Sequence, residues 1–215
     1  MRSKFDEQLE QLNKKMIEMS ALCEKLIAKA SYALLREDAD LAKQVIVDGE
    51  GVDQSEREIE GLCVKLILQQ QPVAGDLRQI STALKMVTDI ERIGDHAEDI
   101  AEIIPFLQNQ DAESFHLIRK MSQATIQMVK QSIDAYVRKD VKLAEDVIVQ
   151  DDVVDVFFLK MKTLLIKMIA ENPGKGEFAL DLLMISKYFE RIGDHAVNIA
   201  EWVIYSVTGK RKGEG

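Results

Sequence analysis

A twelve-residue stretch occurs twice in the chain, and this repeat constrains the fold more than any other feature. Residues 91–102 read ERIGDHAEDIAE and residues 190–201 read ERIGDHAVNIAE, so ten of the twelve positions are identical. Landmarks between Asp38 and Asp53 recur 102 positions later, whereas the acidic stretch recurs 99 positions later, a difference of three residues. The chain is therefore predicted to contain two copies of one structural unit, the second shortened by three residues between these landmarks.

Apolar residues recur every three or four positions along most of the chain, which predicts an all-α protein. The first apolar stripe begins with Phe5, Leu9 and Leu12. Three prolines and eleven glycines stand mostly between such stripes, where they favour helix ends. We expect six long helices, at residues 3–36, from a cap at Asp38 or Asp40 to 71, and at 73–104, 111–138, 141–170 and 177–207.

The repeat and the short connections together predict two tandem antiparallel three-helix bundles. We expect residues 1–107 to form the first bundle, residues 108–208 the second, and residues 209–215 a tail. Helices of about thirty residues are about 45 Å long, because each residue adds about 1.5 Å. The molecule should therefore be elongated.

The composition limits the setting in which the chain works. Its 28 basic and 37 acidic residues give a net charge of −9, the wrong sign for binding nucleic acid through its phosphates. No apolar run reaches the roughly 18 residues of a membrane span, and the N-terminus turns acidic before a signal-like core develops. We expect a cytoplasmic protein in which Cys23 and Cys63 are buried thiols, since both lie among apolar residues.

Acidic residues form a stripe on the predicted helix that carries the first copy of the repeat. At about 100° per residue, Glu91, Asp95, Glu98 and Glu102 lie within about 60° of one another. Like charges at this spacing each destabilise a helix by a few tenths of a kcal/mol, so a cation should complete the stripe. Clusters of carboxylates on facing helices suit hard cations or iron.

The candidate metal ligands are all carboxylates, and they come from both halves of the chain. Asp151 and Asp155 lie four residues apart on one predicted helix, where they can face the second acidic stretch. The corresponding pair in the first half is Gly49 and Asp53, so the first site lacks one acid. The candidate ligands are Asp53, Glu91 and Asp95 in the first half and Asp151, Asp155, Glu190 and Asp194 in the second.

Two other interpretations of the acidic stripes remain open. A solvated acidic surface on a purely structural bundle is the usual meaning of a run of charges. A carboxylate-bridged metallo-hydrolase or oxidase is the enzyme alternative. The Glu-x-x-His pairs of di-iron oxidases are absent, however, since Gly94 follows Glu91 by three residues and Ala101 follows Glu98. No phosphate-binding glycine loop or nucleophile with a neighbouring base occurs in the sequence, so we predict no catalytic residue.

The glycines and histidines within the repeat have simpler roles than metal binding. Gly94 and Gly193 each lower helix stability by about 1 kcal/mol relative to alanine, which indicates close packing against a neighbouring helix. His96 and His195 are predicted to be packed or hydrogen-bonded rather than ligands.

The stretch QQPVAGDLR at residues 70–78, followed by ERIGDHA at 91–97 and at 190–196, resembles the PhoU family of phosphate-uptake regulators. The resemblance covers nearly the whole chain and implies a tandem pair of three-helix bundles. It also implies multinuclear iron or zinc sites on Glu/Asp-x-x-x-Asp motifs. Three motifs match in full: Glu91 with Asp95, Glu190 with Asp194, and Asp151 with Asp155. In the fourth motif Gly49 stands at the first position, so only its second residue, Asp53, is acidic.

The resemblance further implies a role rather than a reaction. PhoU proteins are negative regulators that link a phosphate ABC transporter to a sensor histidine kinase, so that phosphate-starvation genes stay off when phosphate is plentiful. We therefore expect a cytoplasmic, homodimeric adaptor without catalytic activity. Its expected partners are the transporter ATPase and the kinase, and it should reach the membrane only through them.

Overall fold

The computed structural model describes residues 2–70, 72–107 and 111–210, and in these residues the chain forms six long α-helices, two 3₁₀ turns and no strand. The long helices are α1 (Arg2–Arg36), α2 (Ala39–Gln70), α3 (Ala74–Ile103), α4 (Ala112–Arg138), α5 (Val141–Glu171) and α6 (Gly176–Thr208). The short turns η1 (Ile104–Phe106) and η2 (Pro173–Lys175) follow α3 and α5. The predicted all-α class and the six helices are confirmed; residue 71, where the second helix was expected to end, lies outside the described residues.

The first helix of each half ends, and the next begins, in the same way. Glu37 and Lys139, which are 102 positions apart, both adopt the left-handed conformation, with φ of 53° and 54°. The side chain of Asp38 then accepts a hydrogen bond from the backbone N–H of Leu41 at 2.9 Å, and Asp140 caps α5 in the same manner. These caps satisfy backbone groups that a helix end leaves free, so the duplication extends to the turns.

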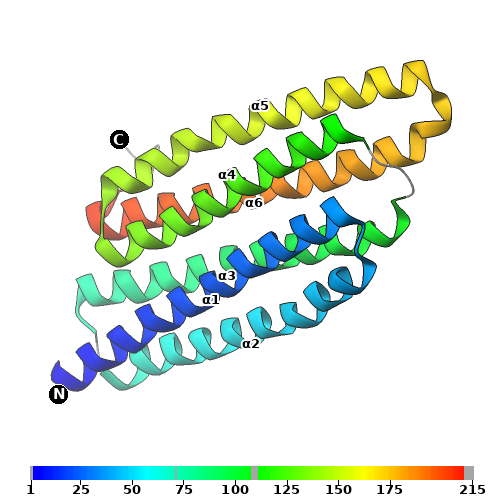
Figure 1. Ribbon diagram of the computed structural model, residues 1–215. Helices are drawn as coiled ribbons and strands as arrows, with labels where there is room; N and C mark the ends of the chain where they lie inside the picture. Colours follow the sequence, from blue (N-terminus) through cyan, green and yellow to red (C-terminus); the bar gives the residue numbers. More distant parts are fainter. Residues whose placement is uncertain (1, 71, 108–110, 211–215) are drawn as a thin grey trace.

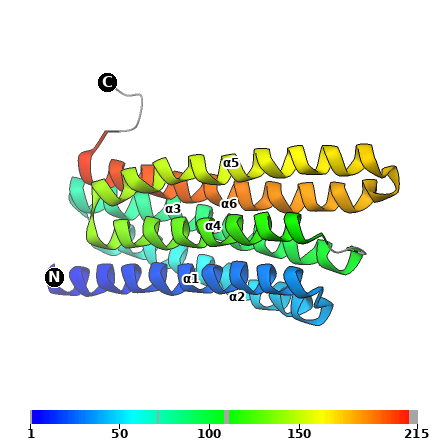
Figure 2. The same cartoon turned by 45° about the horizontal axis from the view of Figure 1, so that its top comes forward.

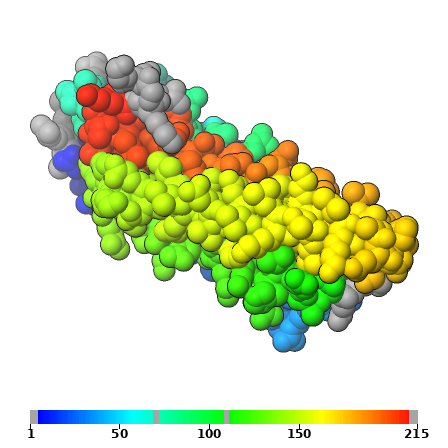
Figure 3. All heavy atoms as spheres, turned by 90° about the horizontal axis from the view of Figure 1, so that it is seen from above, coloured from blue at the N-terminus to red at the C-terminus, as the bar shows by residue number. Residues whose placement is uncertain are grey.

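The six helices form two three-helix bundles that lie side by side along their length (Figure 1). Helices α1, α2 and α3 pack together, as do α4, α5 and α6. Between the bundles α3 packs along α6 and α1 along α4, and the turned view in Figure 2 shows the same alignment. Figure 3 shows an elongated molecule with α5 running along one face. The predicted tandem bundles are thus confirmed.

The core runs through both bundles and buries equivalent positions of the two repeats. Six fully buried side chains form three pairs separated by 99 positions: Ile90 and Phe189, Ile93 and Ile192, Ala97 and Ala196. Cys23 and Cys63 are buried free thiols, as expected. Because the apolar side of α3 and α6 is used for packing, their acidic residues are placed on the remaining faces.

The predicted limits of the two bundles and of the tail fall partly on residues that the structure does not describe. Residues 108–110, at the expected boundary between the bundles, and residues 211–215 of the expected tail lie outside the described residues. The domain limits therefore stay a prediction. No helix in the described part of the chain is both long and apolar enough to cross a membrane.

Candidate metal centres

The first cluster joins two neighbouring helices of the first bundle. Asp53 lies on α2, and Glu91 and Asp95 lie one turn apart on α3. One carboxylate oxygen from each residue lies within 4.8 Å of the other two. Antiparallel packing brings Asp53 opposite the acidic face of α3, as the sequence predicted. We call these three residues the first centre.

The first centre contains a carboxylate oxygen whose hydrogen-bonding capacity is unused. Oε2 of Glu91 is buried and accepts no hydrogen bond, although the Glu91 side chain as a whole is 18% exposed. Arg92 lies at the edge of the centre, with Nε 3.5 Å from this oxygen and a guanidinium N–H donating to Asp95 at 2.9 Å. A buried polar atom without a hydrogen bond is costly, and a bound cation would satisfy it.

Negative charge accumulates around the first centre. Burial and the neighbouring Asp95 raise the pKa of Glu91. Burial, with the charges of Asp95 and Asp53, raises the pKa of Glu98 to about 7. Both shifts mean that the ionised carboxylates are destabilised in the metal-free protein. A divalent cation would reverse this penalty, because it favours the charged form of every carboxylate near it.

The second cluster occupies the equivalent place between α5 and α6. It consists of Asp151 and Asp155 on α5 with Glu190 and Asp194 on α6, and we call it the second centre. Burial, followed by the charges of Asp194, Asp155 and Glu190, raises the pKa of Asp151 to about 6. Oδ1 of Asp151 is buried and accepts no hydrogen bond. Asp151 on α5 therefore interacts electrostatically with both predicted acids of α6, Glu190 and Asp194.

The two centres differ in how tightly their acids converge. Asp155 and Asp194 are exposed, whereas Asp53, Glu91 and Asp95 are half-buried. Among the described residues, the first centre is the group of three acids whose oxygens all approach within 4.8 Å. Lys187 forms an ion pair with Glu190 in the second centre. The sequence predicted that the first site lacks one acid, yet its three remaining acids lie closer together than the four of the second half.

One acid of this region was not among the predicted ligands. The carboxylate of Glu98 lies against Gly49, where a Cβ atom would be only 1.8 Å from its Oε1. The alignment of the two repeats shows Gly49 only as the loss of an acid, because Glu98 belongs to a different helix. The comparison of the two repeats contained the signal, because Val197 stands where Glu98 would be expected to recur.

The glycines and histidines of the repeat have the roles predicted for them. A Cβ on Gly94 would lie 3.0 Å from Cγ1 of Val52, and one on Gly193 would lie 2.9 Å from Oδ1 of Asp151. Both glycines therefore allow a neighbouring helix to approach closely. His96 donates from Nδ1 to Asp99 at 3.0 Å, and His195 donates to Asp89 at 2.9 Å. The ring centres of the two histidines are 5.6 Å apart, where the bundles meet.

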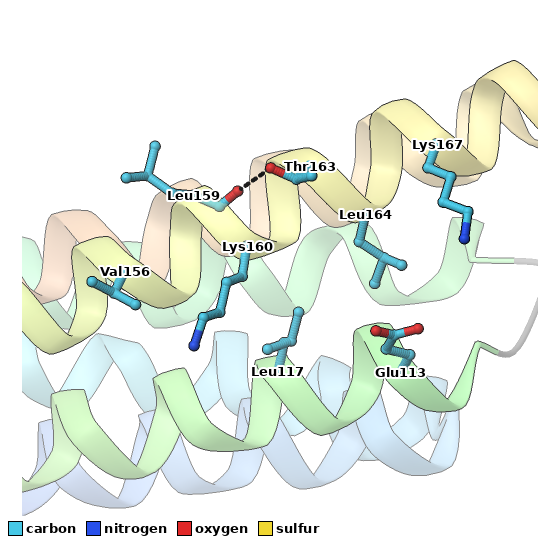
Figure 4. Close-up of a pocket in the computed structure, with 8 residues that line it drawn as sticks. All are labelled: Glu113, Leu117, Val156, Leu159, Lys160, Thr163, Leu164 and Lys167. Atoms are coloured by element: carbon cyan, nitrogen blue, oxygen red, sulfur yellow. Dashed lines mark hydrogen bonds between the residues drawn. The ribbon is translucent and has the colours of Figure 1, made fainter.

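A groove of about 540 Å³ between α4 and α5 lies apart from both centres (Figure 4). Its walls are apolar side chains flanked by charged ones: Glu113, Leu117, Val156, Leu159, Lys160, Thr163, Leu164 and Lys167. None of the proposed metal ligands is among these residues.

The fold is a tandem repeat of a three-helix bundle, and in each bundle acidic residues of two neighbouring helices form a cluster. These features define a class of tandem-repeat helical-bundle proteins. Within that class, the chain belongs to the PhoU family. The PhoU domain family model matches residues 16–104 and again residues 118–203. The two matches correspond to the two bundles, so the resemblance suggested by the motifs is confirmed.

Relatives match over nearly the whole chain. A phosphate-specific transport system accessory protein PhoU homolog of Clostridium acetobutylicum is 38% identical over 212 residues, covering 96% of this chain and 95% of that protein. A protein of the same name from Pseudomonas aeruginosa is 35% identical over 207 residues, covering 95% of this chain and 86% of its own length.

Solved structures have the same fold. The crystal structure of PhoU from Pseudomonas aeruginosa matches with a TM-score of 0.91 and 35% identity, covering 96% of this chain and all of that one (100%). The phosphate transport system regulatory protein PhoU from Streptococcus pneumoniae matches with a TM-score of 0.90 and 25% identity, covering 97% and 99% of the two chains.

Proposed function

We propose that this protein is a regulatory accessory protein of phosphate transport that binds metal ions at its two acidic centres and acts by contact with partners rather than by catalysis. The observation that carries the metal-binding part is the pair of buried carboxylate oxygens without hydrogen bonds, on Glu91 and Asp151. They belong to centres that occupy equivalent places in the two halves. A solvated acidic surface does not require buried, unsatisfied oxygens at both places.

The donor atoms limit which metal suits the centres. Asp53, Glu91 and Asp95 would hold metal in the first centre, and Asp151, Asp155, Glu190 and Asp194 in the second. Both sets contain only carboxylate oxygens, which bind hard cations, also bind the iron of carboxylate-bridged sites in helical bundles, and can bind zinc. We propose multinuclear clusters of iron or zinc, iron being the better match to an all-oxygen set. The bound ions would link helices within each bundle and thereby stabilise the fold.

The role in phosphate transport is supported by the names of the relatives. Proteins that share 38% and 35% of their residues with this chain are named phosphate-specific transport system accessory proteins. We propose that the chain negatively regulates a phosphate ABC transporter and the phosphate-starvation two-component system. In this proposal a cytoplasmic homodimer contacts the transporter ATPase and the sensor histidine kinase.

Elemental analysis of protein purified without a metal-affinity tag tests the metal-binding proposal. Wild type is compared with the double variant Glu190→Gln, Asp194→Asn, and with the control Glu145→Gln, Asp146→Asn, which removes the same charge from α5 outside the centre. We expect more than one metal equivalent in the wild type and the control, and a lower content in the first variant. Metal absent from the wild type, or retained by the variant, would contradict metal binding at the second centre.

The regulatory role has its own test in cells. A reporter for a phosphate-starvation gene is measured in phosphate-rich medium, in a strain that lacks its own PhoU protein and produces this chain. The wild-type chain should keep the reporter off, and the same double variant should release it. A reporter that stays active with the wild-type chain, whatever its metal content, would contradict negative regulation.

A further inference from the structure

The outer face of α5 combines exposed apolar side chains with lysines, and Figure 3 shows this helix running along one face of the molecule. Residues 156–170 read VFFLKMKTLLIKMIA, so the stretch has three lysines and no acid in a chain with a net charge of −9. Val156, Leu159 and Ile166 are all exposed, the last two at 58% and 60%. At about 100° per residue these three lie within about 80° of one another. Exposed apolar residues gathered in this way indicate a binding surface, whereas single ones do not.

The first copy of the same helix, α2, buries equivalent positions. Four buried residues of α2 recur as buried residues of α5, each 102 positions later: Val52, Ile59, Cys63 and Leu66 correspond to Val154, Met161, Leu165 and Met168. The inward faces of the two helices therefore pack in the same register in both bundles. This agreement allows their outward faces to be compared position by position.

The outward faces of the two copies differ in polarity and in charge. Three exposed residues of α2, Gln54, Arg57 and Glu58, correspond to the exposed residues Val156, Leu159 and Lys160 of α5. Glu60 corresponds to Lys162, so a second acid of the first half is replaced by a lysine. Packing within the bundle does not require these changes, because the side chains are exposed. The outer face of α5 is therefore suited to a contact that α2 does not make.

Beside this face, α4 and α5 form the groove shown in Figure 4. Leu117 of α4 points toward α5, and Leu164 of α5 points toward α4. The groove has a volume of about 540 Å³, and a second cavity of about 270 Å³ adjoins it and shares Leu164 and Lys167. Together the two cavities extend along α5 from Val156 to Glu171, which is about 22 Å or four helical turns. A groove of this length suits a helical segment.

The two ends of the groove differ in charge. At one end, Nζ of Lys160 lies 5.6 Å from the ring centre of Phe157, and Nζ of Lys120 on α4 lies 5.7 Å from the same ring. In the part of the chain that the structure describes, neither lysine forms an ion pair with an acid. The other end carries both charges, Glu113 with Lys167. The end near Lys160 is thus basic and favours acidic groups on a bound molecule.

Two other occupants of this surface are less favourable. A twofold contact between two copies, centred on residues 156–170, would place lysines opposite lysines. An anionic lipid surface suits lysines beside apolar side chains, but a flat surface leaves the groove between α4 and α5 unfilled. A helix of another protein fills the groove and can bring acids to its basic end.

We propose that the groove between α4 and α5 binds an amphipathic helix of a partner protein. Apolar side chains spaced three and four residues apart on that helix enter the groove between Leu117 and Val156, with Leu159 at its outer edge. Acidic side chains at one end of the helix pair with Lys120 and Lys160. The inference rests on the proposed function and deepens it, because it assigns one partner contact to a surface of the second bundle.

A helix-stabilised peptide of about 18 residues, with leucines at the apolar positions and glutamates elsewhere, tests the chemistry of the proposed partner. Its fluorescence anisotropy is measured as wild-type protein is added at about 0.15 M salt. One control peptide has the same composition in shuffled order, and another has lysine in place of glutamate. We expect the protein to bind the acidic amphipathic peptide about tenfold or more tightly than either control.

A triple variant tests the place of binding. Val156→Gln, Leu159→Arg and Lys160→Glu together copy the exposed residues of α2 onto α5, and should weaken binding of the acidic peptide about tenfold or more, because apolar contacts are lost and one charge is reversed. The control, Lys14→Glu with Lys43→Glu, lowers the net charge further at exposed positions of the first bundle and should bind as the wild type does. Circular dichroism confirms that each variant keeps its helix content.

The reporter for a phosphate-starvation gene provides the test in cells. The triple variant should release the reporter that the wild-type chain keeps off, while its metal content stays at the wild-type level. A reporter that stays active with the wild-type chain contradicts the proposed regulation, and peptide binding then still decides whether the groove binds an acidic helix. The two failures are therefore distinguishable.

Several outcomes would overturn the inference. One is acidic peptide that binds no more tightly than its controls, or equally well to the wild type and the triple variant. Another is a triple variant that has lost peptide binding and still keeps the reporter off. Binding to phosphatidylglycerol vesicles that is lost in the triple variant, without binding of the peptide, would assign the face to a membrane. A dimer in sedimentation that is lost in the triple variant would assign it to a second copy of this chain.

Discussion

His195 on α6 donates a hydrogen bond from Nδ1 to Oδ1 of Asp89 on α3, at a distance of 2.9 Å. The same oxygen accepts a second hydrogen bond from the side chain of Asn198, at 3.0 Å. His195 directly follows Asp194 of the second centre, and Asp89 lies two residues before Glu91 of the first. The interface between the bundles therefore connects two chain segments that also carry the acidic centres.

Removal of the Asp89 carboxylate should destabilise the protein. Asp89 is 14% exposed and His195 is 22% exposed, so their hydrogen bond is largely shielded from water. We expect Asp89→Ala to lower the free energy of unfolding by about 1 to 3 kcal/mol, because two hydrogen-bond donors lose their partner. Urea denaturation of the metal-free protein measures this value.

Asp48→Ala is the matched control for that measurement. Asp48 forms an ion pair with Lys29, but both side chains are well exposed, at 48% and 40%. Surface pairs of this kind contribute about 0 to 1 kcal/mol. A loss in the Asp89 variant no larger than in this control would refute a stabilising role for the link between the bundles.

The stability of the metal-free protein should depend on pH through Glu98. Its pKa in the folded protein is about 7, above the ordinary value of 4.5 for glutamate. A raised carboxyl pKa favours the folded state at low pH, and this contribution is lost as the pH rises through about 7. In the presence of a chelator, we expect the melting temperature to fall between about pH 5 and pH 8.

The variant Glu98→Gln isolates this contribution, since it leaves the other titrating groups in place. Its advantage in melting temperature over the wild type should grow with pH across this range. Addition of Fe²⁺ should reduce the pH dependence of the wild type, because a cation stabilises the ionised carboxylate. An unchanged difference between wild type and variant from pH 5 to pH 8 would contradict the raised pKa of Glu98.

Alanine at Gly193 should affect the second centre more than the fold. A Cβ atom there would lie 2.9 Å from Oδ1 of Asp151, so the carboxylate must move. Helix propensity gains about 1 kcal/mol from the same change, which offsets part of the crowding. We expect Gly193→Ala to change stability by less than about 1 kcal/mol but to weaken metal binding at the second centre about tenfold.

Gly61 provides the comparison for this glycine. It is exposed on α2, and a Cβ atom on it would meet nothing within 4 Å. Gly61→Ala should stabilise the protein by about 0.5 to 1 kcal/mol and leave the metal content unchanged. Equal metal content in the Gly193 and Gly61 variants would argue against a ligand role for Asp151.

The two thiols should be unreactive in the folded protein. Cys23 is fully buried and donates a weak hydrogen bond to the backbone oxygen of Ile90 at 3.3 Å. Burial raises the pKa of Cys23, and burial with the charge of Glu60 raises the pKa of Cys63 to about 12. Little thiolate is therefore present at neutral pH. A thiol reagent should label both residues in denaturant and neither one within minutes under native conditions; rapid labelling of the native protein would show that the core opens.

The helices and their caps could be predicted because they depend on neighbours in the sequence. The three-to-four-residue apolar spacing placed all six helices, and one of the two proposed caps, Asp38, is the residue that caps α2. The first centre was also predictable, since Glu91 and Asp95 lie one turn apart and Asp53 belongs to the same repeated motif set. These features require only the helical period and the comparison of the two repeats.

The features that were missed depend on which helix faces which. The hydrogen bond between Asp89 and His195 joins residues 106 positions apart, and it exists because α3 packs along α6. Glu98 lies beside Gly49 because of how α2 and α3 are aligned along their length. This alignment would have to be predicted to within less than one helical turn. Periodicity gives the face on which a residue lies but not its partner on another helix.

The most direct test of the two centres is anomalous X-ray diffraction from crystals of the wild-type protein equilibrated with Fe²⁺, recorded above and below the iron absorption edge. We predict iron peaks at both centres, one bounded by Asp53, Glu91 and Asp95 and the other by Asp151, Asp155, Glu190 and Asp194. Well-ordered carboxylates with no anomalous peak at either cluster would contradict the central claim that these acids are metal centres.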